Sequence, residues 1–454
     1  MVVTTQARQL RLSPPPSATI SSIIYDPSSL SLALMHSDSS FSLYPSVSPF
    51  SPPPIPSATT TTTVSPPSSS ATFLHLRFND TSRVIFVVSS PHLAGSSILL
   101  RFYMLRTDKQ FARVRVICNQ SDLSFDEKKL GVLFRVNHGD SVKLASAINV
   151  FAMYAESKVW VFAVKVMEDG DVIKLMKTAV IDCDLPVFCI SVSVGFLILG
   201  EENGVRAFPL RPLVKGRVKK SDKSKVQKLN LMNGIIAGSN GSSVLYVKSG
   251  KGTGGSSNYM NVNGNMEEKI VKQYDNSAKL RLMKVRQNSQ EGGTRFVPFK
   301  SNEFEDYKPT EVPLMIKAIS IHFLARDKFL ILNSVGELYL LSLSNNVSGS
   351  ESSYAMKQLT LTMNVQNLAV LADNSTKAQT VWVSDGHYTI HALIVSDVDS
   401  TTNENDTNDI EEKIQSSATQ LIFTSEKIQE IIPLSVNSIL LLGQANNIFA
   451  YAIS

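Results

Sequence analysis

The sequence predicts an all-β protein, and two observations carry that prediction. Apolar residues make up 43% of the 454 residues, and Leu, Ile and Val fall mostly in short runs of four to eight residues. Runs of this length that are bounded by small and polar residues are typical of β-strands and are short for helices. The second observation is a strand-turn-strand pattern that recurs along the chain.

Six copies of this pattern share an apolar run, a turn of small, polar or acidic residues, and a second run of alternating apolar residues. Each copy is predicted to be a β-hairpin, because Gly, Asn and Asp tolerate the positive φ of a tight turn and β-branched and aromatic residues flank it. Asn203-Gly204 and Asp385-Gly386 are the strongest turn signals. The copies lie at 30–45, 148–164, 195–210, 328–343, 379–394 and 438–453, and a looser seventh copy with a longer loop lies at 83–105.

Further apolar segments next to these hairpins extend each unit to three or four antiparallel strands. Units of this kind match the blades of a β-propeller, in which radial repetition protects the sheet edges. One blade per hairpin gives seven blades in a single domain over residues 1–454, and segment 7–13 is expected to supply the outer strand of the last blade. A further hairpin at 233–248 would make eight blades. The added strands are expected at 18–27, 71–78, 185–192, 315–324 and 427–434.

The segments SDGHYTIHAL, SDSSFSLYP and EENGVRAFPL resemble the turn and closing aromatic residue of the WD40-like (transducin-like) β-propeller family. The resemblance covers residues 7–45, 71–212 and 313–454. No copy ends in Trp-Asp, and the Gly386-His387 dipeptide lies in a turn instead of opening a repeat. By analogy with such propellers, and because a rigid ring fixes many loops in space, we expect a non-catalytic scaffold that binds other proteins in a larger assembly.

Three tracts interrupt the pattern and are expected to be disordered insertions. Residues 46–70 are rich in Pro, Ser and Thr, and residues 213–312 begin basic and then become rich in Gly, Ser and Asn. Residues 397–413 carry seven acidic residues and one Lys. Such compositions bury too little apolar surface to offset the entropy of ordering the chain.

The net charge of +5 is concentrated in one segment at the start of the second tract. Its two basic clusters resemble a nuclear localisation signal, and the same charge would attract acidic proteins or nucleic acid phosphates. The alternative is a solvated Lys-rich loop. The segment has no aromatic residue, which argues against stacking on single-stranded nucleic acid. The basic residues are Lys215, Arg217, Lys219, Lys220, Lys223, Lys225 and Lys228, against one acid, Asp222.

Four other features fit structural roles better than reactive or ligand sites. His387 and His391, four residues apart on a strand, would lie about 13 Å apart, too far to share a metal. The sequence GKGTGG at 250–255 lacks the following helix that a dinucleotide site needs. The acids of MEDGD (167–171) and DCD (182–184) suit turns and strand ends, and Trp160 and Trp382 suit packing between blades. We therefore expect no catalytic residues, no metal and no cofactor.

The chain has no apolar run near the roughly 20 residues that span a bilayer, so a soluble protein is expected. Its three cysteines, Cys118, Cys183 and Cys189, have no zinc-type spacing and are expected to be reduced thiols. The first 25 residues lack acids, which loosely suits an organelle transit peptide, but the strand pattern begins at about Ala18. The expected location is therefore the nucleus, the cytoplasm or both.

Overall fold

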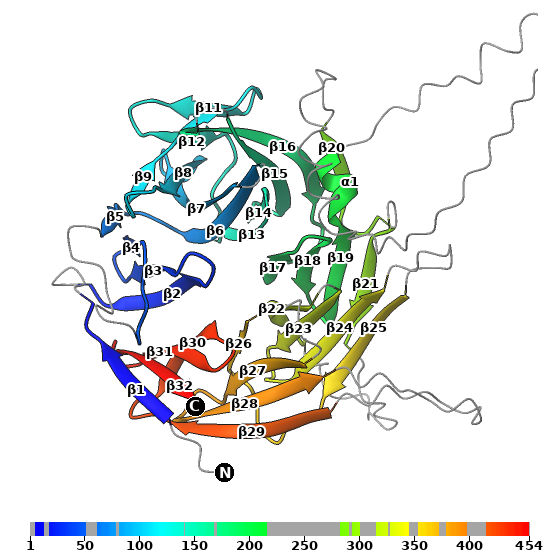
Figure 1. Cartoon of the computed structure of the whole chain (residues 1–454). Coiled ribbons are helices and arrows are strands. Elements are labelled where there is room, and N and C mark those ends of the chain that lie inside the picture. Colours follow the sequence, from blue (N-terminus) through cyan, green and yellow to red (C-terminus); the bar gives the residue numbers. More distant parts are fainter. Residues whose placement is uncertain are drawn as a thin grey trace, which may run out of the picture. The chain divides into compact units, whose positions relative to one another are not determined.

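The computed structural model describes residues 5–12, 18–50, 61–78, 81–139, 141–167, 170–215, 282–289, 293–299, 315–325, 327–344, 353–371, 378–396 and 415–453. Its strands form seven sheets, which follow one another around a ring in chain order (Figure 1). Each sheet is a blade, and its first strand is the one nearest the centre of the ring (Figure 1). The predicted seven-bladed β-propeller is confirmed, and the hairpin considered at 233–248 lies outside the described residues.

Blades 1, 5 and 6 are four-stranded antiparallel sheets in simple chain order. Blade 1 contains β2 (Ile20–Asp26), β3 (Ser31–His36), β4 (Phe41–Tyr44) and β5 (Thr62–Val64). Blade 5 contains β22 (Ala318–Ala325), β23 (Lys328–Asn333), β24 (Leu338–Ser344) and β25 (Ser353–Leu359). Blade 6 contains β26 (Asn367–Val370), β27 (Ala378–Ser384), β28 (Thr389–Ser396) and β29 (Gln415–Phe423).

Blades 2 and 3 carry extra strands on their outer sides. Blade 2 contains β6 (Ser70–Phe78), β7 (Thr81–His92), β8 (Ser97–Leu105), β9 (Phe111–Arg113), β11 (Leu123–Asp126) and β12 (Gly131–Phe134). Blade 3 contains β13 (Lys143–Ala147), β14 (Val150–Ala155), β15 (Lys158–Val166) and β16 (Val172–Asp182), with β10 (Arg115–Ile117) and β20 (Met283–Arg286) paired to the outside of β16.

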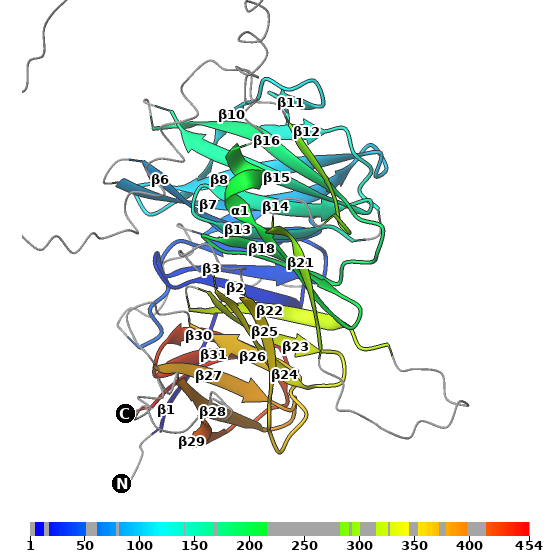
Figure 2. The same ribbon diagram turned by 90° about the vertical axis from the view of Figure 1, so that its right-hand side faces the viewer.

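Blade 4 contains the one helix among the described residues. Its elements are β17 (Cys189–Val192), β18 (Phe196–Glu201), β19 (Gly204–Pro209), the helix α1 (Leu210–Lys215) and β21 (Arg295–Pro298). Blade 7 contains β30 (Ile428–Ser435), β31 (Ser438–Gly443), β32 (Ile448–Ile453) and the N-terminal strand β1 (Thr5–Leu10). Figure 2 shows the ring from the side on which α1, β16 and β21 lie.

All seven predicted hairpins are confirmed, because each corresponds to a pair of hydrogen-bonded neighbouring strands. The two strongest turn signals have the positive φ that a tight turn needs: Asn203 has φ of 60° and Gly386 has φ of 80°. Both values lie in the left-handed region that Asn and Gly enter most readily. The five added segments form β2, β6, β17, β22 and β30, the first strands of their blades.

Apolar side chains that pass between neighbouring sheets hold the ring together. Between blades 1 and 2, Phe41 meets Phe86 edge to face, with ring centroids 5.3 Å apart. Between blades 2 and 3, Phe134 meets Trp160 at 4.9 Å, and Trp382 fills the space between blades 6 and 7. Full burial of a side chain of this size contributes about 1.5–3 kcal/mol. The predicted packing role of both tryptophans is confirmed.

The N-terminal strand closes the ring. β1 pairs antiparallel with β32 over six residue pairs, from Thr5 opposite Ile453 to Leu10 opposite Ile448. Leu10 is buried in a cluster that also contains Ile20 of blade 1 and Ile448 of blade 7. The first strand of the chain therefore completes the last blade and joins it to the first, as predicted.

The outer edge of blade 3 is covered by two short strands and by one side chain between them. β10 pairs in parallel with Val172–Lys174 of β16, and β20 pairs in parallel with Ala179–Asp182. Between them the side-chain amide of Gln120 accepts from Lys177 N at 2.7 Å and donates to Lys177 O at 2.8 Å. The amide thus takes the place of a strand, and it covers backbone groups that would otherwise present a free edge.

Two of the expected insertions contain strands that composition did not reveal. β5 lies within 46–70, where it pairs with β4 and Val64 is fully buried. β20 and β21 lie within 213–312, and β21 is the fourth strand of blade 4. The second insertion therefore lies inside blade 4 and not between two blades. Both differences have one cause: these short strands gain their hydrogen bonds from a distant partner strand, which local composition does not show.

Candidate protein-binding face

The polarity of the strands gives the ring two different faces. In every blade the chain enters at the start of the first strand and turns back between the second and third strands on that same side. We call this side the entry face. The first-to-second and third-to-fourth connections lie on the opposite side, which we call the insertion face.

The low-complexity tracts all start from the insertion face. Residues 45–61 connect β4 to β5, residues 210–294 connect β19 to β21, and residues 397–414 connect β28 to β29. Each is a connection between the third and fourth strands of its blade. A sheet tolerates long insertions there because the paired strands on both sides fix the two ends.

The entry face carries the most exposed large hydrophobic side chains among the described residues. Phe423 is 72% exposed, Leu93 71% and Met315 61%. Leu185, Ile319 and Tyr388 are further exposed residues on this face, whereas the insertion face has Leu30, Val194 and Val436. Leu93 also has φ of 49°. Glycine, which has no Cβ atom, adopts this left-handed conformation without strain, whereas leucine disfavours it.

The predicted basic segment is described only at its first residue. Lys215 is the last residue of α1 and is half-buried. The other basic residues, Arg217 to Lys228, lie outside the described residues, as does GKGTGG. α1 itself is fixed to the ring by the buried side chains of Leu210, Leu213 and Val214.

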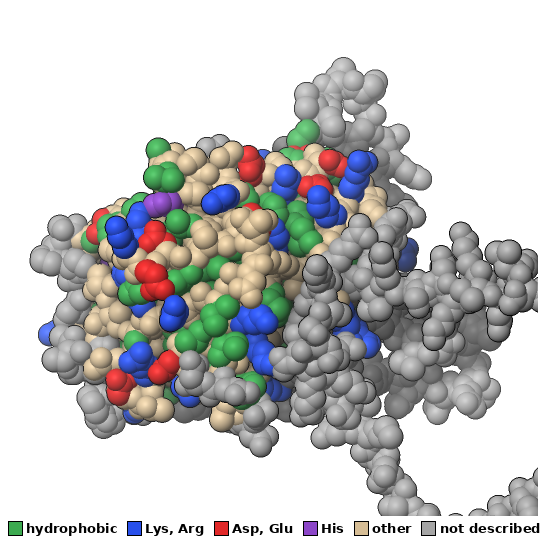
Figure 3. Space-filling model, turned by 90° about the horizontal axis from the view of Figure 1, so that it is seen from above, with side chains coloured by type: hydrophobic (Ala, Val, Ile, Leu, Met, Phe, Trp, Pro, Cys, Tyr) green, Lys and Arg blue, Asp and Glu red, His purple; other side chains and the backbone are tan. Residues whose placement is uncertain are grey.

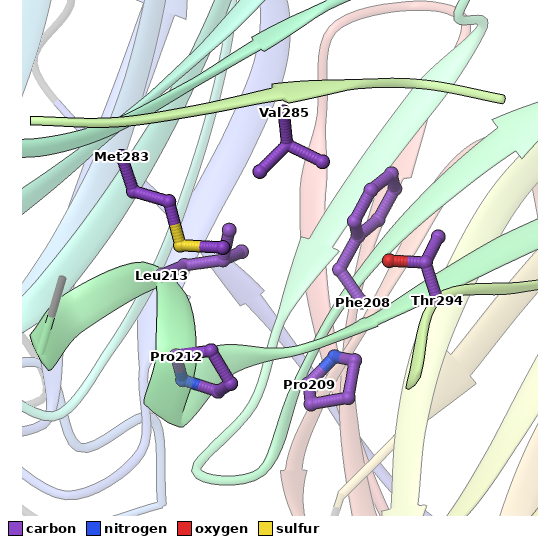
Figure 4. A pocket seen from close by; sticks show the side chains of 7 residues that line it. All are labelled: Phe208, Pro209, Pro212, Leu213, Met283, Val285 and Thr294. Atoms are coloured by element: carbon purple, nitrogen blue, oxygen red, sulfur yellow. The ribbon is translucent and has the colours of Figure 1, made fainter. Parts of the chain in front are cut away.

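Side chains of α1, β19 and β20 point toward one another where the insertion leaves and rejoins the ring (Figure 4). Leu213, Phe208, Met283 and Val285 leave a space of about 10 Å³. A space of that size holds a single water at most. The junction is therefore a packed anchor and not a ligand pocket.

A buried polar network ties the returning chain to blade 4. Arg206 donates to both carboxylate oxygens of Glu201, at 2.7 Å and 3.0 Å, and Glu201 is fully buried. Gln287, directly after β20, donates to the same carboxylate at 2.8 Å and accepts from Leu185 N. Because a buried charge is costly unless it is paired, this network fixes the position of residue 287 closely.

The insertion face has a cavity of about 280 Å³ lined by Ser28, His75, Arg77, Ser82 and Ile148. Beside it, His75 Nε2 lies 2.9 Å from the buried carboxylate of Asp26. Ser28 Oγ is 3.1 Å from both oxygens of that carboxylate. Serine, histidine and aspartate thus meet across blades 1 and 2, which raises the question of a nucleophilic triad.

The geometry differs from that of a triad. In a triad, the hydroxyl and the carboxylate bond to opposite ring nitrogens of the histidine. Here Ser28 Oγ is 3.4 Å from Nε2, the nitrogen that faces Asp26, and 3.5 Å from Nδ1. The hydroxyl donates to Asp26 instead. Burial raises the pKa of Asp26, but the bond and charge of His75 and the hydroxyls of Ser28 and Ser29 outweigh it and hold that pKa below its usual value.

Burial shifts the pKa of two ionisable groups that lie on the first strands of their blades. His322 on β22 bonds to Ser320 Oγ at 2.8 Å, and burial lowers its pKa to about 4, so its ring is neutral at physiological pH. Glu430 on β30 accepts from Ile23 N of blade 1 at 2.9 Å. Burial raises the pKa of Glu430 to about 7, against a smaller opposing effect of the bonds from Ile23 and Ser22.

The remaining sequence candidates are spread around the ring. His387 lies in the turn between β27 and β28, where it is exposed, and His391 lies on β28 opposite Val383. Gly170 of MEDGD closes the turn between β15 and β16, with φ of 74°. Asp182 ends β16, and Asp184 follows in the connection to blade 4. Among the described residues no group of His, Cys, Asp and Glu is arranged to hold a metal ion.

The cysteines are free thiols, as predicted. Burial raises the pKa of Cys183 and of Cys189 to about 12. The thiolate is the reactive form, so burial disfavours the reactive form of both residues.

The described part of the rim over blades 2 and 3 is mixed in character. Lys and Arg side chains are interspersed there with Asp and Glu and with hydrophobic side chains (Figure 3). One exposed pair on this rim is Arg115 and Glu127, 3.2 Å apart. Charges of opposite sign that are interspersed in this way largely cancel in their long-range field.

Sequence reasoning did not find Asp26, His75 or Glu430. Each makes its decisive contact with a residue of the neighbouring blade, so no spacing along the chain marks them. The exposed side chains of the entry face were also missed, because a single hydrophobic residue near a turn looks the same whether it is buried or not.

No protein-family model and no curated protein matches the chain. Similar solved structures are WD40 or β-propeller domains, each 8% identical in sequence to this chain. The β-propeller domain of Cps50 (Swd1) from Myceliophteria thermophila has a TM-score of 0.46, with 99% of this chain and 100% of that chain covered. The RRP9 WD40 repeats have a TM-score of 0.45, with 100% of both chains covered.

The assignment of the propeller rests on the strand pairing of this chain itself. Within the part of the chain that the structure describes, no helix has the length and hydropathy needed to cross a bilayer.

We expect the substitution Glu430→Gln to stabilise the protein at high pH but not at low pH. The folded carboxyl holds its proton up to about pH 7, whereas the ordinary value is 4.5, so stability is lost as pH rises through that window. Gln keeps an acceptor for Ile23 N and has no charge to bury. The gain in free energy of unfolding at pH 8 relative to pH 4 is expected to be about 2 kcal/mol.

Denaturant titrations of both proteins across that pH range measure the effect. Glu127→Gln is the control for the loss of an exposed carboxylate, because Glu127 is 67% exposed, and the change measured for Glu430→Gln should exceed that of the control. A constant difference for Glu430→Gln would contradict the burial of the carboxylate.

Proposed function

We propose that the chain is a non-catalytic scaffold that binds other proteins through the entry face of its propeller. The observation that carries the proposal is that Phe423, Leu93 and Met315, the most exposed large hydrophobic side chains of the described residues, all lie on that face. Exposed aromatic and long aliphatic side chains on a rigid framework are the residues that anchor protein interfaces.

The construction of the ring supports the same conclusion. The turns of the entry face are short and are held between hydrogen-bonded strands, so their side chains keep fixed positions before a partner binds. A surface that is already ordered loses less entropy on binding. The group of residues that most resembles an active site contains Asp26, His75 and Ser28. There the hydroxyl of Ser28 donates a hydrogen bond to the carboxylate of Asp26 and is not free to attack a substrate.

The test compares two double variants of the tagged full-length chain. Leu93→Ser with Phe423→Ser changes the entry face, and Val194→Ser with Val436→Ser changes residues of 52% and 48% exposure on the insertion face. Quantitative mass spectrometry of purified complexes should show partners reduced at least about tenfold by the first variant, a loss of about 1.4 kcal/mol, and unchanged by the second.

Both variants should unfold at the temperature of the native protein, since the altered side chains are exposed. Equal recovery of partners by the two variants would place the interface elsewhere. A native chain that retains no partner in stoichiometric amount would count against a scaffold of any kind.

We also propose that the basic segment is a recognition element for an acidic partner, such as a nuclear import receptor. The packing of α1 supports this, because the segment leaves the ring from a fixed helix whose last residue is Lys215. The competing proposal is that the same charges bind nucleic acid or chromatin in the nucleus.

A variant with Arg217, Lys219, Lys220, Lys223, Lys225 and Lys228 replaced by Gln separates these proposals. Lys215 is kept because it is half-buried in α1. Import recognition predicts that a fluorescent fusion of the variant loses nuclear enrichment. Nucleic acid binding predicts that the native chain binds duplex DNA with an affinity that falls steeply with salt, and that the variant does not. Unchanged location together with no DNA binding would leave the segment a solvated loop.

A further inference from the structure

Arg101 is a buried cation without an acidic partner among the described residues. It lies on β8, on the side of blade 2 that faces blade 1, and is 5% exposed. Its Nη1 donates to Ser65 Oγ at 3.2 Å, and its Nη2 donates to Ser65 O at 2.9 Å and to Ser90 Oγ at 2.8 Å. A third hydroxyl, that of Ser68, lies 3.2 Å from Nη2.

This environment differs from that of the other buried arginine. Arg206 donates two parallel hydrogen bonds to a carboxylate, whereas Arg101 donates its hydrogen bonds to three hydroxyls and one carbonyl. A buried charge surrounded only by neutral groups is poorly compensated. Arg101 Nε and the neighbouring hydroxyl of Tyr103 have no hydrogen-bond partner in the described part of the chain. The group as a whole therefore has unused capacity for an anion.

A second cation increases the local positive charge. The guanidinium of Arg113 lies over the ring of Tyr103, 5.8 Å from its centroid. Burial is the main cause that lowers the pKa of Arg101; the neighbouring Tyr103 acts against it, and the charge of Arg113 adds to it. An anion placed beside these two groups would relieve their repulsion.

Ser65 is the exposed residue among the three serines of the group. It lies in the connection from β5 to β6 on the entry face and is followed directly by Pro66. Ser68 and Ser90 are 4% and 3% exposed and are closed to an enzyme in the folded protein. Ser65 thus combines access from solvent with direct contact to the buried guanidinium.

We propose that Ser65 is a phosphorylation site and that Arg101 is the receptor for its phosphate. A proline-directed protein kinase would transfer the γ-phosphoryl group of ATP to Ser65 Oγ: the new O–P bond forms, the bond between the β- and γ-phosphates breaks, ADP leaves, and the hydroxyl proton passes to the base of the kinase. The phosphate oxygens then lie within reach of Nη1, and a charge-assisted pair replaces a neutral hydrogen bond.

This modification would change the entry face as well as the ring. It adds about two negative charges at the junction of blades 1 and 2 on that face. It also ties the β5–β6 connection more firmly to blade 2, because both ends of the new ion pair are held by strands. The proposal does not depend on what the entry face binds.

The experiment uses the full chain treated with ATP and a proline-directed serine kinase, with sites mapped by mass spectrometry. Ser13 and Ser51 also precede proline and serve as comparison sites within the same molecule. In a ³¹P NMR pH titration, the phosphate on Ser65 should titrate at least about half a pH unit lower than the phosphates on the comparison sites, because the adjacent guanidinium favours the dianion. The thermal midpoint should rise by a few degrees, and Ser65→Ala should abolish the rise.

Arg101→Lys is the matched variant, since it keeps the charge but loses the planar fork that binds two phosphate oxygens. It should reduce the downward shift of the Ser65 phosphate. If this variant does not fold, the comparison sites in the native chain still decide the question.

Three results would overturn the proposal. The first is a native chain in which Ser65 stays unmodified. The second is a Ser65 phosphate that titrates like the comparison phosphates. The third is a rise in thermal midpoint that free inorganic phosphate reproduces in the Ser65→Ala variant, which would assign the arginine to a dissociable anion.

Discussion

The structure depends on one constraint: both faces of nearly every sheet are apolar, and only the neighbouring sheets can cover them. Phe41 of blade 1 is covered by Phe86 of blade 2, and Phe134 of blade 2 packs against Trp160 of blade 3. A row of such sheets would leave an apolar face open at each end, so the row must close into a ring. The pairing of β1 with β32 provides that closure.

Closure also separates the two faces of the molecule. Because every blade begins on the same side, the turns between second and third strands lie on the entry face, and the third-to-fourth connections begin and end on the insertion face. The ring thereby presents exposed apolar side chains such as Phe423 on one side, and the strands that flank its low-complexity tracts face the tracts on the other side. The buried pair of Glu201 and Arg206 anchors the largest tract at its return point.

The repeating hairpins could be predicted from the sequence because their signals are local: apolar runs flank a turn with Asn203 or Gly386. The strands β5, β10, β20 and β21 could not, because they are three or four residues long and gain their bonds from partners elsewhere in the chain. The same reason applies to the polar contacts. Asp26 meets His75, Ile23 meets Glu430 and Ser65 meets Arg101 across the gap between two blades, and no spacing along the sequence encodes such a meeting.

Native-state hydrogen exchange of β1 tests the closed ring most directly, because it reports whether the N-terminal strand opens by itself or only with the whole domain. If closure holds the ring together, the hydrogen-bonded amides of Thr5–Leu10 will exchange with the same opening free energy as those of Ser438–Gly443 in β31. Exchange in β1 that is orders of magnitude faster than in β31 would contradict the account, since the other sheets would then remain folded without the strand that joins the last blade to the first.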